Sequence, residues 1–382
     1  MADFNKGDIA EAILAAAVAA RFKKRFKESD FANQKRPMPI NVKNLKPINV
    51  ADVQEVLRQV VQGSAVYNVR DFDKRTKTES NVFDNITVSV SIPQASMNFL
   101  TKPANWASVN NIFNSAVTKV NQDSKLRSSA LTLSVNLKED TISVRGVGTE
   151  NQKGTKVDLL VEVTQGGKNL RGHSKKISLK YDAPQFGQVV GLEFENFGKI
   201  FDPLGLNNYQ NFNAMFNEAI MTPFPDILSK RFDSRDSITS SKEVVALKKV
   251  AKEVFRSITT QLGSKLDDVE FKEQLARYCI QKATGNESGV ELVKFTPSGG
   301  QYTQKFGQTF IDNVKATDFD VTFDPSGSDP KIIVHEKGKG TGNPYKLIQF
   351  RYRTDASASN KAGQKKILMR SYVESGDLLY KL

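Results

Sequence analysis

The sequence is poor in the residues that form disulfides or bind transition metals. Among its 382 residues there is one cysteine, Cys279, and there are two histidines, His173 and His335. A single cysteine excludes an internal disulfide framework and any zinc site built from several cysteines. Two histidines also make a histidine-rich metal centre an unexpected feature. The scarcity of both residue types therefore excludes disulfide-stabilised scaffolds and multi-cysteine zinc proteins.

Long apolar runs are absent as well. No segment approaches the roughly 18 consecutive apolar residues that a membrane helix requires. The apolar stretch 9–20 contains Glu11 and is followed by the basic segment 21–27, whereas a signal peptide has its basic region first. We therefore expect a protein without membrane contact that resides in the cytoplasm, which would be the host cytoplasm if a bacteriophage encodes it.

The signatures of common enzyme families are missing too. The chain has neither a GxxxxGK[ST] phosphate loop nor a GxGxxG motif after a strand. It lacks a GxSxG nucleophile elbow, an HExxH motif and a plausible Ser-His-Asp set. The glycine-rich stretch 338–342 has no helix behind it, so we interpret it as a loop between strands.

What the sequence does contain is a globular composition with an excess of positive charge. Hydrophobic residues make up 39% and charged residues 25%, which is typical of a soluble protein with a substantial core. The formal net charge is +13, most of it in residues 1–50 and 336–382. Basic ends favour contact with a polyanion, because neutralising phosphates releases counterions. DNA is therefore the expected partner, although such charge also promotes solubility.

The hydrophobic pattern predicts an α+β fold in three parts. Residues 1–205 combine an N-terminal amphipathic helix with predicted strands at 86–93, 130–137, 141–148, 156–163 and 175–181. Residues 206–288 are predicted to be helical, and residues 289–382 to form a β-rich basic C-terminal region. Residues 185–201 are interpreted as the beginning of a helix, although their glycines count against it.

The stretch 156–188 contains the most suggestive chemistry. Two predicted strands flank the hairpin signal Gly166–Gly167; the first begins with Asp158 and the second carries Lys180. If the strands pair, a carboxylate meets an ammonium group. Magnesium prefers hard oxygen ligands, and a lysine beside it can orient or deprotonate an attacking water. The plainer interpretation is an ordinary hairpin, with Asp158 at a strand edge and Lys180 on a solvated face.

This pattern resembles the PD-(D/E)XK nuclease superfamily. In that family a helix with a glutamate precedes a strand with the essential aspartate, and a second strand with (D/E)-x-Lys is followed by another helix. The matching positions are Glu11 in KGDIAEAIL, Asp158 in GTKVDLLVEV and Lys180 in ISLKY. The resemblance covers roughly 1–30 and 130–200. It implies a restriction-endonuclease-like mixed β-sheet core flanked by helices, with residues 206–288 as a helical insertion.

The resemblance implies a Mg²⁺-dependent DNA endonuclease, with Mn²⁺ able to substitute. Glu11, Asp158 and the backbone carbonyl of Leu179 would hold the metal, and Lys180 would activate water. Ser178 stands where the family usually has an acid, so Glu11 is the candidate for the missing carboxylate.

Two further residues follow from the same comparison. Glu162 is the alternative acid. It lies four residues after Asp158, and residues four apart in a strand share a face. Gln185 resembles the glutamine that some exonuclease branches of the family carry after the lysine strand, as does Gln188.

Two basic groups are expected to hold the DNA: Lys168, Arg171, Lys175 and Lys176 in the turn, and Arg351, Arg353 and Arg370 near the C-terminus. The arginines alternate with aromatic residues, a combination that can grip phosphates and stack on bases. The alternative for the C-terminal group is a sheet with one apolar and one charged face. A homodimer is compatible with the resemblance, since many such endonucleases cut both strands as dimers.

A competing hypothesis comes from the same residues. The missing acid at Ser178 favours a non-catalytic DNA-binding or virion structural protein that keeps a degenerate nuclease-like fold. A weaker one is a capsid-associated or host-interaction protein without a nucleic-acid role.

Overall fold

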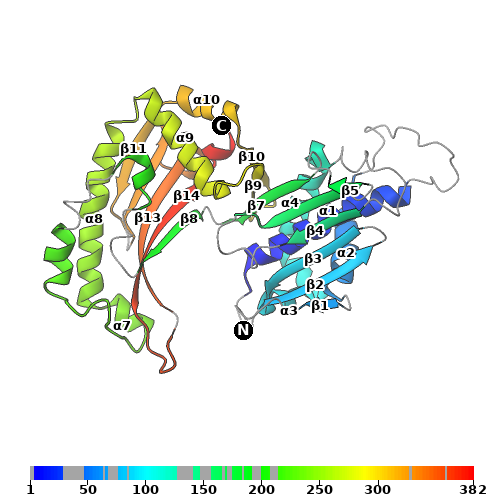
Figure 1. Ribbon diagram of the computed structural model, residues 1–382, viewed down its shortest axis with the longest axis horizontal. Coiled ribbons are helices and arrows are strands. Elements are labelled where there is room, and N and C mark those ends of the chain that lie inside the picture. The colour runs from blue at the N-terminus through cyan, green and yellow to red at the C-terminus, as the bar shows by residue number, and fades with distance from the viewer. Residues whose placement is uncertain are drawn as a thin grey trace. The chain divides into compact units, whose positions relative to one another are not determined.

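The computed structural model of the protein describes residues 4–28, 47–62, 65–67, 76–83, 86–126, 141–146, 156–165, 168–169, 174–182, 185–191, 199–206, 214–326, 329–357 and 359–382. In these residues the protein is α+β, with a mixed sheet and a separate antiparallel sheet, each accompanied by helices (Figure 1). The chain groups into two compact units: Met1–Ala183 with Thr284–Lys305, and Pro184–Ala283 with Phe306–Leu382. None of the described helices is long and apolar enough to cross a membrane.

The first unit is built on a sheet with nine strands in the described residues. Its order is β1 (Ala65–Tyr67), β2 (Thr76–Phe83), β3 (Ile86–Pro93), β4 (Thr141–Gly146), β5 (Leu159–Gln165), β7 (Lys175–Tyr181), β9 (Val290–Phe295) and β10 (Gln301–Lys305), while β6 (Lys168–Asn169) pairs with β5. The β3–β4 and β7–β9 pairs are parallel. The β5–β7 pair is antiparallel, as the sequence predicted.

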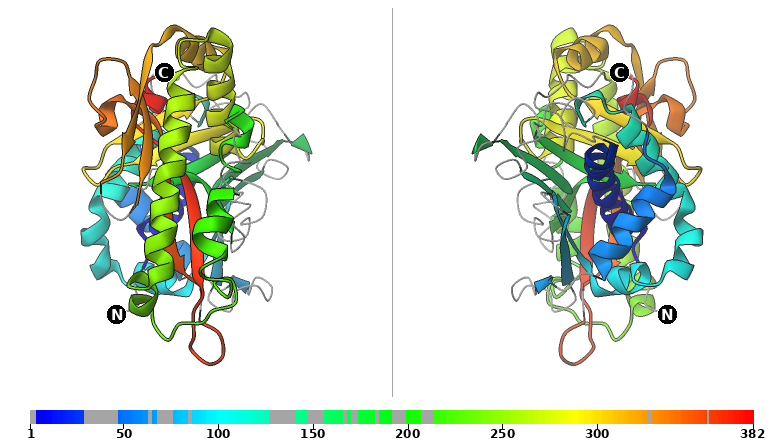
Figure 2. Two further views of the ribbon diagram at one scale, coloured as in Figure 1. Left: turned by 90° about the vertical axis from the view of Figure 1, so that its left-hand side faces the viewer. Right: turned by 90° about the vertical axis from the view of Figure 1, so that its right-hand side faces the viewer.

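Helix α1 (Lys6–Glu28) forms the centre of the first unit. It contacts β3, β4 and β7 on one side, and α2 (Val50–Val61), α3 (Gln94–Leu100) and α4 (Asn110–Gln122) on the others. Figure 2 shows α1 between the sheet and α2. Its side chains from Ile9 to Phe22 are buried around the whole helix, so the stretch predicted to be amphipathic is a fully buried helix. The many alanines let its neighbours pack closely.

Local features of the chain begin two of the helices that pack around α1, namely α2 and α4. The side chain of Asn49 accepts a hydrogen bond from the Asp52 N–H at 3.0 Å, and the Asp52 carboxylate accepts one from the Asn49 N–H at 2.8 Å. This capping box begins α2. The 3₁₀ segment η3 (Pro103–Val109) leads into α4, whose apolar residues face the core.

The second unit contains an antiparallel sheet with five strands in the described residues. Its order is β11 (Phe319–Asp324), β12 (Lys331–Glu336), β13 (Lys346–Ala356), β14 (Ile367–Ser375) and β8 (Gln185–Gly191). Helices α8 (Lys242–Gly263) and α9 (Val269–Thr284) lie along one face (Figure 1). There Phe350 of β13 packs against Phe201 and Tyr278. The remaining helical elements are η5 (Asp202–Leu204), η6 (Asn217–Met221), α7 (Arg235–Thr239), α10 (Gln308–Ala316), η7 (Asn343–Tyr345) and η8 (Leu378–Tyr380).

The arrangement differs from the prediction in two respects. Residues 185–191 form strand β8 instead of beginning a helix; the β-branched Val189 and Val190 suit the ladder that β8 forms with β14. The expected boundaries at 205/206 and 288/289 do not coincide with the two units, because β9 and β10 return to the first sheet. The predicted strand 130–137 lies outside the described residues.

Candidate active site

Asp158 lies just before β5, and its carboxylate is held by the neighbouring strand β7. Its Oδ2 accepts hydrogen bonds from the backbone N–H of Leu179 at 2.6 Å, from Lys180 Nζ at 3.1 Å and from Ser178 Oγ at 3.3 Å. The backbone N–H of Asp158 donates to the carbonyl of Ile177 at 2.8 Å. The side chains of Asp158 and Lys180 therefore meet, as the predicted pairing of the strands requires.

The pleat of β7 separates the polar side of this site from the core. Ile177 and Leu179 face the apolar cluster around α1, whereas Ser178 and Lys180 alternate to the other face. The side chains of Asp158 and Lys180 are 16% and 18% exposed. The pair is thus largely shielded from water but remains partly exposed.

A second carboxylate near Asp158 comes from the first turn of α1, and it belongs to Asp8. Its Oδ2 accepts a hydrogen bond from Ser96 Oγ at 3.1 Å, and its Oδ1 accepts one from Asn5 Nδ2 at 3.3 Å. Burial raises the pKa of Asp8, the hydrogen bond from Ser96 lowers it, and the charge of Asp158 raises it; the net result lies above the usual 3.8. A cation between two such carboxylates would relieve their repulsion.

Sequence reasoning named Glu11 as the acid on this helix and missed Asp8. Both lie in KGDIAEAIL, but Glu11 is three residues farther along α1 and is buried within the helix packing. In the described part of the chain, the hydrogen bonds to the Asp158 carboxylate come from β7. The ionisation of Asp8, which lies nearer the beginning of the helix, responds to the charge of Asp158. The role of Glu11 as a metal ligand therefore stays a prediction.

The other predicted site residues are less well placed. Glu162 lies in β5 opposite Ser143. Four residue rises separate its Cα from that of Asp158 by roughly 13 Å, which does not favour a shared metal ion. Leu179 contributes its N–H to Asp158, whereas a role for its carbonyl stays a prediction. Gln185 lies in β8 and belongs to the second unit, together with Gln188.

Lys156 is a second lysine in this region that the sequence did not single out. It is partly buried. Burial lowers its pKa below the usual 10.5, and the positive charge of Lys180 lowers it further, whereas the charge of Asp158 opposes the shift. Asp8 and Lys156 therefore both lie within electrostatic range of the Asp158–Lys180 pair.

The fit of this group to a metal can be judged from its oxygen atoms. Among the described residues, no group of three or more His, Cys, Asp or Glu is placed to hold a metal ion. Magnesium needs less, since it is usually bound by one or two carboxylates together with water and substrate phosphates. Asp8 and Asp158 meet that requirement, and the described residues provide no hydrogen-bond donor to Asp158 Oδ1. The donor set fits magnesium and does not fit zinc.

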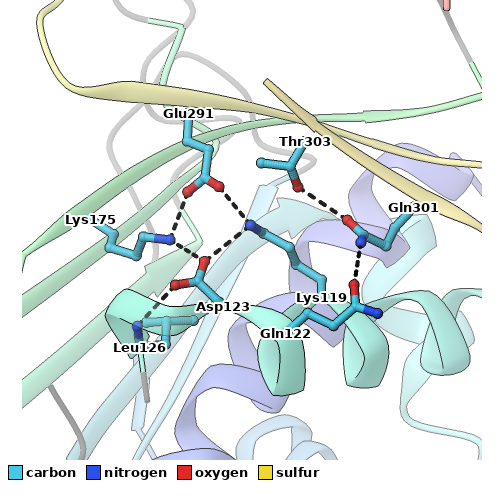
Figure 3. Close-up of polar contacts among 8 residues, drawn as sticks. All are labelled: Lys119, Gln122, Asp123, Leu126, Lys175, Glu291, Gln301 and Thr303. Carbon is cyan, nitrogen blue, oxygen red and sulfur yellow. Dashed lines mark hydrogen bonds and ion pairs between the residues drawn. The ribbon is translucent and has the colours of Figure 1, made fainter. Parts of the chain in front are cut away.

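The lysines predicted to bind DNA have different surroundings. Lys175 is buried and forms ion pairs with Asp123 and Glu291 (Figure 3), so the prediction that it contacts DNA is wrong. It sits on the face of β7 that is turned to α4, opposite to Lys180. Lys176 pairs with Glu287 at 2.6 Å and remains 38% exposed. Lys168 is exposed in β6, while Arg171 and His173 lie outside the described residues.

The three predicted arginines share one face of the second sheet. Arg351 lies 3.0 Å from Glu374 and 5.0 Å from the ring centre of Tyr372. Arg353 is opposite Arg370 in the β13–β14 register, and Arg370 lies 3.8 Å from Asp355. Acidic partners offset much of this charge, and Phe350 and Tyr352 fill the buried opposite face. The alternative of one apolar and one charged face therefore describes this sheet.

Two other residues with reactive side chains, Cys279 and His335, are buried in the fold. Cys279 is buried in α9, and burial raises the pKa of its thiol to about 12, which makes it a poor nucleophile. His335 is buried and its Nε2 lies 2.9 Å from Thr322 Oγ1 on the adjacent strand.

Comparisons of the chain with protein-family models, with curated proteins and with solved structures find no match.

Proposed function

We propose that this protein is a Mg²⁺-dependent nuclease that hydrolyses phosphodiester bonds of DNA at the site around Asp158. One observation carries the proposal: Asp158 is joined to Ser178, Leu179 and Lys180 across β5 and β7, and a second carboxylate, Asp8, lies within its electrostatic reach. This is the grouping that the PD-(D/E)XK resemblance implies, with Asp8 taking the place expected for Glu11.

Asp8 and Asp158 are the residues that would hold the metal. When bound, Mg²⁺ supplies counter-charge for the phosphate and lowers the pKa of a coordinated water. The hydrogen bonds from Leu179, Ser178 and Lys180 all reach Asp158 Oδ2, which fixes the orientation of that carboxylate. Asp158 would offer its Oδ1 to the ion, since the described residues provide no hydrogen-bond donor to that oxygen.

The two lysines supply the positive charge that a phosphodiester substrate needs. Lys180 orients the attacking water and stabilises the charge that develops on the phosphate. Lys156, whose lowered pKa reflects burial and the neighbouring Lys180, is assigned to the substrate phosphate. The net charge of +13 supports a polyanionic substrate.

The restriction-endonuclease-like core is part of the same proposal. A mixed sheet with α1 against one face supports it, and so does the antiparallel pair β5–β7 followed by the parallel strand β9. The segment after β7 departs from the family pattern, because it enters the second sheet as β8 where a helix is expected.

The direct test is cleavage of supercoiled plasmid in the presence of Mg²⁺ or Mn²⁺. Asp158→Asn and Lys180→Met should each reduce the rate by about 10²- to 10⁴-fold, the range for loss of a positioned catalytic group. Lys102→Met is the control, because Lys102 is an exposed lysine of the same unit with no assigned role in DNA binding. Circular dichroism and thermal unfolding establish that the variants fold. Cleavage that survives both substitutions at the site overturns the assignment.

A second candidate is a non-catalytic DNA-binding or virion structural protein with a degenerate nuclease-like fold. It is favoured by Ser178, whose hydroxyl donates to Asp158 where the family pattern has an acid. This alternative predicts salt-sensitive DNA retention without cleavage in either metal. The plasmid assay and a binding assay in the same buffers separate the two.

A further inference from the structure

Four buried charged side chains form a closed network on the other face of β7 (Figure 3). Lys119 Nζ lies 3.0 Å from Asp123 Oδ2 and 2.7 Å from Glu291 Oε1. Lys175 Nζ lies 2.7 Å from Glu291 Oε2 and also contacts Asp123 Oδ2. All four side chains are at most 5% exposed. Two positive and two negative charges balance, so the network as a whole is neutral.

This network forms one wall of a pocket in the first unit. The pocket has a volume of ≈ 190 Å³ and lies between the end of α4 and strands β9 and β10. That volume corresponds to roughly six waters at about 30 Å³ each, which is room for a phosphate group with some of its hydration. Besides Lys119, Asp123 and Glu291, the lining consists of Gln122, Ser124, Gln301, Thr303 and Lys305.

The hydrogen bonds already made in the wall leave an excess of donors. Gln301 Nε2 donates to Gln122 Oε1 at 2.9 Å, and Thr303 Oγ1 donates to Gln301 Oε1 at 3.1 Å. Both amide oxygens are therefore engaged, while the amide nitrogen of Gln122 keeps its hydrogens for another acceptor. Lys119 uses two of its three N–H groups on Asp123 and Glu291. A ligand for this wall must bring acceptor oxygens.

The charge of the pocket points the same way. The carboxylates of Asp123 and Glu291 are each neutralised within the network. Lys305 is exposed at the pocket, and within the described part of the chain it forms no ion pair. Its ammonium group therefore makes the pocket cationic overall.

We propose that this pocket binds a phosphate group that is free or terminal. Lys305, the Gln122 amide, the Ser124 hydroxyl and the third N–H of Lys119 supply the donors, and lysine is a common point-charge partner of phosphate. The group can be inorganic phosphate or the terminal phosphate of a nucleic-acid strand, which present the same oxygens. The inference does not depend on hydrolysis at Asp158, which lies toward the other face of β7.

Calorimetric titration of the full chain in EDTA tests this binding without any metal-dependent cleavage. The probes are inorganic phosphate and one oligonucleotide in three forms, with a 5′-phosphate, a 3′-phosphate or free hydroxyl ends. Lys305→Met should weaken phosphate binding at least about tenfold, the loss of one charge-assisted contact. Gln122→Met should weaken it too, and Lys102→Met, at an exposed lysine of the same unit, should not.

The outcomes separate the sources of the phosphate. A preference for one phosphorylated oligonucleotide that disappears in Lys305→Met supports a strand end as the ligand, and binding of inorganic phosphate alone supports a small anion. Absence of binding by every probe overturns the proposal, as does equal binding by Lys305→Met and Lys102→Met. Loss of plasmid cleavage in Asp158→Asn bears only on the nuclease proposal, so the two can fail separately.

Discussion

Lys180 Nζ lies 3.1 Å from Asp158 Oδ2 across the paired strands β5 and β7. The same oxygen receives the Leu179 N–H at 2.6 Å, so the carboxylate is held by both the side chain and the backbone of β7. These contacts fix the position of the Asp158 carboxylate. The roles proposed for Asp8 and Lys156 depend on that position, because both residues interact electrostatically with Asp158.

The ionisation of Asp8 should respond to Asp158. In Asp158→Asn the pKa of Asp8 should fall toward 3.8, because the neighbouring negative charge is removed. In Ser96→Ala it should rise, because the hydrogen bond that favours the ionised form is lost. A pH titration of the side-chain carboxyl carbons by NMR measures both shifts. Asp236→Asn, in the second unit, serves as the control. An Asp8 pKa that does not move in Asp158→Asn would contradict the proximity of the two acids.

Asp8→Asn and Glu11→Gln should have different consequences for cleavage. Asp8→Asn should abolish it, because one of the two assigned metal ligands is lost, whereas Glu11→Gln should retain it.

The raised pKa of Asp8 means that its ionised form destabilises the fold, and this cost grows as the pH rises from 3.8 through the folded pKa. Asp8→Asn should therefore not lower the free energy of unfolding at neutral pH. Plasmid cleavage and urea unfolding check the pair, and the reverse activity pattern would reinstate Glu11.

Lys156 should matter for the rate through its charge. Lys156→Met should slow single-turnover cleavage by about 10²-fold, the usual loss for one group that stabilises transition-state charge, and Lys156→Arg should recover part of it. Lys102→Met changes an exposed lysine of the same unit and provides the control. Full activity in Lys156→Met, with Asp158→Asn inactive, would remove Lys156 from the site without removing the site.

The buried network should be costly to break. Glu291→Gln leaves Lys119 and Lys175 with one carboxylate between them, and the free energy of unfolding should fall by about 3–5 kcal/mol. Replacing Lys175 by Met in the same chain should restore part of the loss, because the charges balance again. Urea unfolding of the single and double variants measures this difference. Equal stability of wild type and Glu291→Gln would show that water or relaxation compensates the unpaired charge.

The same network sets a pH dependence of stability. The ammonium groups of Lys119 and Lys175 hold the pKa values of Asp123 and Glu291 below the usual 3.8 and 4.5, despite the opposing effect of burial. Their contribution is present above the unfolded values and is lost as the pH falls below them toward the folded values, because the unfolded chain takes up protons first. Wild-type stability should therefore decline below about pH 4.5. The double variant Asp123→Asn, Glu291→Gln should show a flatter profile.

DNA binding by the arginines of the second sheet can be tested through its salt dependence. Arg353→Ala should reduce the slope of log K against log salt by about one if this arginine contacts a phosphate. Arg256→Ala on α8 is the matched control, since Arg256 is exposed and paired with Glu253. Fluorescence anisotropy at several salt concentrations gives both slopes. Identical slopes would leave the arginine face as a charged sheet surface.

Short-range patterns in the sequence determined a large part of this protein. Period-two alternation predicted β3, β4, β5 and β7, and the short connection between the last two predicted their antiparallel pairing. Because that pairing is local, the contact of Asp158 with Lys180 followed from it. The alanine-rich segment predicted a helix at α1, although not its burial on every side.

Only the tertiary structure decided which distant residues meet. Asp8 and Glu11 are both acids of one helix, and only the folded chain brings Asp8 within electrostatic range of Asp158. Lys175 has the sequence appearance of a solvated DNA contact, but its partner Glu291 arrives on β9 after the chain has crossed the second unit. Burial and ion pairing depend on such long-range returns of the chain. Neighbouring residues encode pleat, period and local turns, and they carry no information about a partner more than a hundred residues away.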